Sequence, residues 1–76
     1  MNKERRKVLT NAQELLDQAY SLIEQVRDEE QESLDNLPES LSDSDKASTM
    51  SEAIDNMDTA LSHIDDCKST LEDAAA

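Results

Sequence analysis

The sequence predicts an all-α fold, an antiparallel helical hairpin of two long amphipathic helices. Apolar residues recur with helical spacing through both halves of the chain, and the only proline, Pro38, lies between the two periodic stretches. Glycine is absent, so neither stretch contains a residue that breaks helices. We expect one domain over residues 1–76, with helices at about 3–36 and 45–74 and a hinge at 37–44.

In the first half, apolar side chains recur every seven residues, as they do along one face of a helix. Two rows of large side chains lie beside a third row of smaller ones. The pattern predicts a helix from Lys3 to about Asn36. The rows are Leu9, Leu16 and Ile23; Val8, Leu15 and Leu22; and Ala12, Ala19 and Val26.

The second half consists of three consecutive heptads, "AIDNMDT", "ALSHIDD" and "CKSTLED". Each begins with a small residue and has a large apolar residue at its fifth place, which predicts a second amphipathic helix. A third row ends where Lys68 replaces an apolar residue. The rows are Ala53, Ala60 and Cys67; Met57, Ile64 and Leu71; and Ile54 and Leu61.

The hinge is indicated by Asn36 and Pro38, because proline disfavours the helical conformation in the residue before it and lacks a backbone donor. In "SDSD", residues 42–45, Ser44 is the expected N-cap of the second helix. Thr49 with Glu52 forms a rival capping box. Leu37 and Leu41 flank the proline, and we expect both to fold inward.

Each helix carries an apolar stripe three rows wide, which is more than the contact between two helices covers. We therefore expect two hairpins to pair into a four-helix bundle as a homodimer. Cys67 is expected to be a buried packing thiol in the row of small residues. The predicted oligomer core is Leu9, Leu16, Ile23, Met57, Ile64, Leu71, Ala60 and Cys67.

Charge is distributed unevenly along the chain. The net charge is −12, but residues 1–7 hold four cations against one acid, a net +3, which leaves −15 for the rest. Such a body repels phosphate backbones and anionic lipids, so direct nucleic-acid or membrane binding is not expected. It attracts a basic protein surface instead.

Nothing in the sequence predicts an enzyme, a metal site or a cofactor. His63 is the only histidine and has no partner at ligand spacing, so we expect it to be a solvated surface residue. Cys67 is the only cysteine and has no internal disulfide partner. The sequence contains neither a membrane-length apolar run nor a signal-peptide pattern, and we expect a cytoplasmic protein.

The segments "MNKERRK", "RDEEQESLDNLPESL" and "SEAIDNMDTALSHID" resemble small proteins encoded by phages and prophages of Gram-positive bacteria. The NKxRRK start and the DNLPESL hinge are the specific parts of this resemblance. It implies a helical hairpin and a phage-accessory context in the host cell cytoplasm, and it brings no activity with it. The chain departs from the pattern at "SDSDKAST", just after the hinge.

Three hypotheses of function remain open, and the first is inhibition of a host defence or nucleic-acid-handling protein through an acidic surface. Acids at the C-terminal end of the first helix are disfavoured by the helix dipole, which suggests another role for them. Apolar residues near the hinge would supply the desolvated contact. The candidate residues are Asp28, Glu29, Glu30, Glu32, Leu34, Leu37 and Leu41.

The second hypothesis is an oligomeric sponge for an anionic, nucleotide-type ligand. In that case Arg5, Arg6 and Lys7 would hold phosphates and Tyr20 would stack on a base. The third is a structural or assembly adaptor, for which the oligomer itself is the function.

Overall fold

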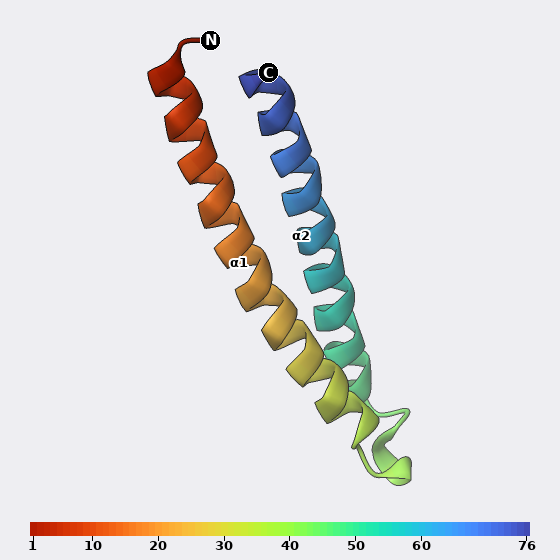
Figure 1. Cartoon of the computed structure of the whole chain (residues 1–76). Helices are drawn as coiled ribbons and strands as arrows, with labels where there is room; N and C mark the ends of the chain where they lie inside the picture. Colours follow the sequence, from red (N-terminus) through yellow and green to blue (C-terminus); the bar gives the residue numbers. More distant parts are fainter.

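A computed structural model describes all 76 residues and contains three helical elements and no strand: α1 (Lys3–Asp35), the short 3-10 helix η1 (Glu39–Leu41) and α2 (Asp45–Ala75). The two long helices run antiparallel, so both chain termini lie at one end of the molecule and the hinge at the other (Figure 1). The predicted all-α hairpin is confirmed.

Side chains and backbone groups cap the helices where the sequence offers them. The Asn2 side chain accepts a hydrogen bond from the Arg5 backbone N–H at 2.8 Å and begins α1. At its other end, α1 finishes at Asp35, and the Asn36 N–H donates to the Glu32 carbonyl at 3.0 Å. Ser44 is the N-cap of α2, as expected, and its hydroxyl accepts from the Ala47 N–H at 3.3 Å.

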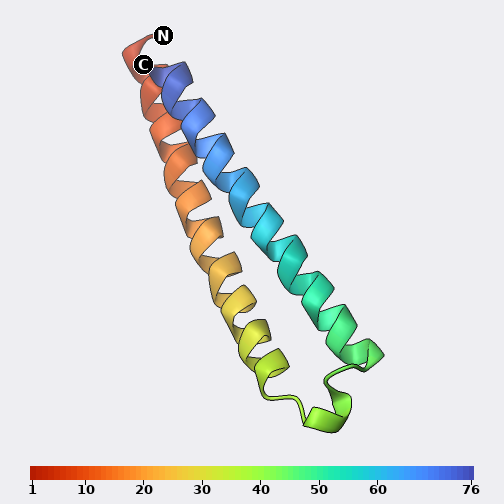
Figure 2. The same ribbon diagram turned by 90° about the vertical axis from the view of Figure 1, so that its right-hand side faces the viewer.

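The hinge is a compact turn that lies beyond the ends of both helices (Figure 2). Ser42 Oγ donates to the Glu39 carbonyl at 2.8 Å, and Ser44 Oγ donates to the Leu41 carbonyl at 2.6 Å. Leu37 is half-buried, but Leu41 remains 43% exposed. The expectation that Leu41 folds inward was wrong, because η1 places it past the helix pair.

The molecule is a rod of 59 × 15 × 12 Å with a radius of gyration of 17.4 Å. A compact globule of this length would have a radius of gyration of about 11 Å. Only Ala47, Ile54 and Leu61, all on α2, are buried, and each keeps 4–8% of its surface exposed. A rod two helices wide therefore encloses very little of its own apolar surface.

The two helices meet along a seam whose residues are spaced alternately three and four apart on each helix. Every residue of the seam is buried or half-buried. On α1 the seam is Leu9, Gln13, Leu16, Tyr20, Ile23, Arg27, Glu30 and Leu34, and on α2 it is Ala47, Met50, Ile54, Met57, Leu61, Ile64, Lys68, Leu71 and Ala75.

The seam differs from the sequence prediction in which rows it uses. Tyr20, which belongs to none of the three apolar rows predicted for the first helix, lies within the seam in a row that also contains Arg27. On α2, Ile54 and Leu61 are buried more deeply than the row of Met57 and its heptad neighbours. On α2 the seam uses two of the three predicted apolar rows, whereas on α1 it uses only the row of Leu9 and a second row that the sequence did not single out. The heptads alone do not say which rows meet.

Candidate functional site

Two ion pairs on one flank of the seam connect the helices. Arg27 Nε donates to Asp58 Oδ1 at 2.8 Å and its Nη2 donates to Oδ2 at 3.4 Å, a bidentate contact. Lys68 pairs with Asp17. These hydrogen bonds raise the pKa of Arg27 and the pKa of Lys68 above their ordinary values.

The two pairs fix one register. Asp17 precedes Arg27 by ten residues on α1, and Asp58 precedes Lys68 by ten on α2. The two contacts therefore repeat the same antiparallel alignment about 15 Å apart along the rod, at a rise of about 1.5 Å per residue. With the seam spacing, this alignment places Ile23 level with Leu61.

The opposite flank of the seam carries no charged residue between Val8 and Val26 on α1 or between Thr49 and Ala74 on α2. On each helix the acid that forms the ion pair comes directly after a residue of one seam row in the sequence. The small residues, such as Ala19 and Ala60, come directly before a residue of the other seam row. The small residues therefore lie on the other side. We call this side the uncharged face: Val8, Ala12, Leu15, Ala19, Leu22 and Val26 of α1, and Thr49, Ala53, Asn56, Ala60, His63, Cys67, Thr70 and Ala74 of α2.

The uncharged face also holds most of the exposed large apolar side chains. Val8 is 67% exposed, Leu15 56%, Leu22 64% and Val26 54%. Charged residues make up 34% of the sequence, yet all of them lie outside this face. Apolar patches that a monomer leaves in water mark interaction surfaces.

Cys67 lies on the uncharged face as a free, exposed thiol. The thiol is exposed in a single hairpin because the row of small residues lies beside the seam and not in it, and its burial in an oligomer stays a prediction. Ala60 is half-buried for the same reason. The six other residues of the predicted oligomer core, Leu9, Leu16, Ile23, Met57, Ile64 and Leu71, are half-buried in the seam.

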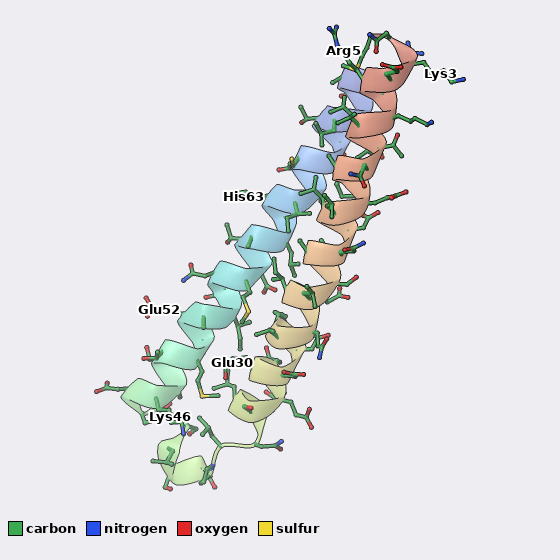
Figure 3. The ribbon with its side chains drawn as sticks, turned by 90° about the vertical axis from the view of Figure 1, so that its left-hand side faces the viewer. Lys3, Arg5, Glu30, Lys46, Glu52 and His63 are labelled. Carbon is green, nitrogen blue, oxygen red and sulfur yellow. The ribbon has the colours of Figure 1, made fainter.

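The predicted partner-binding acids divide into two environments. Asp28, Glu29 and Glu32 are exposed near the C-terminal end of α1, whereas Glu30 continues the seam row of Leu9 and is half-buried. In Figure 3 Glu30 lies between the ribbons of the two helices near the hinge. Of the apolar candidates, Leu34 is half-buried like Leu37, and only Leu41 is exposed.

The hinge end of the rod is uniformly acidic. Residues 28–45 contain eight acids and no cation, and the hinge brings the acids of η1 and of the start of α2 to the end of the rod where α1 finishes. Sequence reasoning singled out only the acids at 28–32. Asp35, Glu39, Asp43 and Asp45 are exposed and extend the same surface.

An open hollow of about 480 Å³ also lies at the hinge end. Its polar lining is unsuited to a small-molecule site, which is typically enclosed and mostly apolar. Ser42 and Ser44 already use their hydroxyls within the hinge. The lining residues are Leu34, Ser42, Asp43, Ser44, Ala47, Ser48 and Ser51.

The basic start of α1 lies at the other end of the rod. The alignment places Leu9 level with Ala75, so residues 3–7 extend past the end of α2 (Figures 1 and 3). Tyr20 lies in the seam about 20 Å from Lys7 along the helix, so one chain does not bring the residues proposed for an anionic ligand together.

Comparison with protein-family models, with curated proteins and with solved structures finds no match. Neither long helix has a segment that is long and apolar enough to cross a bilayer. No three His, Cys, Asp or Glu side chains are grouped so that they could hold a metal ion. His63 is exposed, as expected (Figure 3).

Proposed function

We propose that this protein acts by binding other protein chains and catalyses no reaction. It pairs with a second copy through the uncharged face, and the pair presents an acidic outer surface to a basic protein. The observation that carries the proposal is the separation of charge on the rod: one long face has exposed apolar side chains and no charge, while the remainder holds 19 acids and 7 cations.

Pairing of two hairpins supplies the core that one hairpin lacks. A chain of this size has a marginal core even when compact, and this rod buries only three residues. Complete burial of a Val or Leu side chain contributes about 1.5–3 kcal/mol. The exposed residues of α1 would gain this contribution in a four-helix bundle, where small residues such as Ala19 and Ala60 allow close helix packing.

The acidic hinge end suits a basic partner. Eight acids within residues 28–45 would accelerate association with a cationic surface and disfavour anionic competitors. Leu41, which is 43% exposed among these acids, supplies an apolar contact at their centre. The resemblance to phage accessory proteins makes a host defence or nucleic-acid-handling protein the expected target, and the binding would inhibit it by covering its basic groove.

Analytical ultracentrifugation tests the pairing. We expect the wild type to sediment as a dimer and the Leu15→Glu, Leu22→Glu variant to sediment as a monomer, because two carboxylates would be buried on the uncharged face. The matched control is Gln18→Glu with Ser21→Glu, two exposed α1 positions outside that face. A monomeric wild type, or a variant as dimeric as its control, would contradict the proposal.

Affinity capture from a Gram-positive host lysate tests the acidic surface. Asp28→Lys with Glu32→Lys should lose a protein that the wild type retains, while Asp65→Lys with Asp66→Lys, an equal charge change on α2, should keep it. Salt should elute that protein, because exposed charge pairs are screened at high ionic strength. Equal retention by both variants would count against a site at the hinge end.

A further inference from the structure

The uncharged stripe of α1 has the pattern of a second seam. Its residues continue outward to Arg5 at one end and Glu29 at the other, and all are spaced alternately three and four apart, as in the seam with α2. A helix packs another helix against such a stripe. The stripe is Arg5, Val8, Ala12, Leu15, Ala19, Leu22, Val26 and Glu29.

The side chains along this stripe complement those of a second copy of the stripe that runs in the opposite direction. Against an antiparallel copy, each alanine faces a leucine, each valine faces a valine and the two terminal charges face opposite charges. The facing pairs are Arg5 with Glu29, Val8 with Val26, Ala12 with Leu22, and Leu15 with Ala19, each pair occurring twice about a two-fold axis level with Asp17. An isologous interface requires such self-complementarity.

We infer that two hairpins pair antiparallel through α1, so that the basic end of each lies against the acidic hinge end of the other. The inference rests on the proposed dimer and adds its orientation. The inferred pairing also gives one residue of the acidic segment a cationic partner, because Glu29 faces Arg5 of the second copy. A parallel pairing would instead place Arg5 beside Arg5 and Glu29 beside Glu29, where like charges repel.

Both charged residues are available for this contact. Arg5 forms no ion pair within the hairpin, since the three ion pairs of the structure involve only Arg27 and Lys68 as cations. Glu29 is exposed and accepts only a hydrogen bond from Gln25 Nε2 at 3.2 Å, on its own helix. Arg5 is exposed in the first turns of α1, where a second rod can reach it.

The alignment of the two helices also determines which residue of α2 lies level with the inferred two-fold axis. Lys68 pairs with Asp17, and the seam spacing places Cys67 level with Asp17, the position of the inferred two-fold axis. Cys67 lies on the uncharged face beside Ala60 and Ala74. The two Cys67 side chains of a dimer would therefore lie level with each other, on α2 helices that small residues allow to approach closely.

A charge-reversal cycle tests the orientation. Arg5→Glu and Glu29→Arg should each weaken dimerisation by about tenfold, because each places like charges together at both ends of the interface. The double variant should restore the wild-type dimerisation constant to within about twofold. Lys7→Glu with Glu32→Arg is the control, since both positions lie off the stripe and neither single change should matter.

A distance measurement tests the same arrangement without changing Arg5 or Glu29. With nitroxides on Ser40→Cys in a Cys67→Ser background, antiparallel pairing predicts labels separated by about the 59 Å length of the rod. Nitroxides on Cys67 itself should lie within about 20 Å, which is the 8–10 Å between packed helix axes plus the two linkers.

The two experiments separate failure of the orientation from failure of the dimer. Close hinge labels, or a double reversal that is no better than the single reversals, would overturn the antiparallel pairing. If Leu15→Glu with Leu22→Glu still abolished the dimer, the proposed pairing through the uncharged face would stand. A wild type that is monomeric throughout would overturn both.

Discussion

Arg27 Nε lies 2.8 Å from Asp58 Oδ1, across the seam of the hairpin. Lys68 and Asp17 repeat the arrangement ten residues nearer the chain termini on each helix, with the cation now on α2 and the acid on α1. In both pairs a seam residue extends its aliphatic stem between the helices and places its charge on the flank. The hairpin thus uses two long cations where its apolar rows are interrupted.

The Lys68 pair predicts a stability change at high pH. The hydrogen bond to Asp17 raises the pKa of folded Lys68, so its contribution is fully present below the unfolded value of about 10.4 and is lost as pH rises through the folded value. The melting-temperature difference between wild type and Lys68→Met should therefore shrink between pH 9 and pH 12. Lys46→Met, which removes a lysine without an ion pair, should show no such change. A difference constant with pH would contradict the pairing.

We expect the core to be most sensitive to truncation at Ile54, because this side chain lies in the seam and is only 4% exposed. Ile54→Ala should lower the free energy of unfolding by about 2–4 kcal/mol and Ile54→Val by about 1 kcal/mol, measured by urea denaturation followed by circular dichroism. The valine variant keeps the test valid if the alanine variant does not fold. Met57→Ala, in the half-buried row, should cost less than Ile54→Ala; the reverse order would mean that the seam is misassigned.

We expect loss of the Ser44 hydroxyl to destabilise the start of α2 at the hinge. Its hydroxyl caps α2 by accepting from the Ala47 N–H, so Ser44→Ala should cost about 1 kcal/mol of stability. Ser48→Ala, an exposed change within the first turns of α2, should be neutral or slightly stabilising, because alanine has the higher helix propensity. Equal effects of the two substitutions in thermal unfolding would exclude a capping role.

A larger side chain at position 60 tests how closely the helices of two paired hairpins approach each other. It is half-buried on the uncharged face, and Ala60→Leu should overpack the paired hairpins at a cost of about 1–3 kcal/mol. The expected result is a lower melting temperature and a weaker dimer, whereas Ala60→Ser should leave both near wild type. A leucine variant as stable and as dimeric as the parent would show that Ala60 faces solvent in the assembly.

The rate at which the Cys67 thiol reacts should report whether two hairpins are paired. Its thiol is exposed in one hairpin, so a thiol-reactive dye should label the monomeric Leu15→Glu, Leu22→Glu variant rapidly. In the wild type, labelling should slow by about tenfold or more and should accelerate on dilution, because the uncharged face would be covered. Equal and concentration-independent rates would mean that α2 contributes nothing to the interface.

The sequence by itself determined the two helices, the hinge and the cap at Ser44, because these depend on heptad spacing, one proline and side chains close in the chain. It also determined that the apolar stripe is too wide for two helices. The tertiary structure alone decided that Val8, Leu15 and Leu22 stay outside while Tyr20 and Arg27 enter the seam. The seven-residue repeat defines rows but not their direction, whereas packing and ion pairs between residues far apart in the chain decide how one helix is rotated against the other.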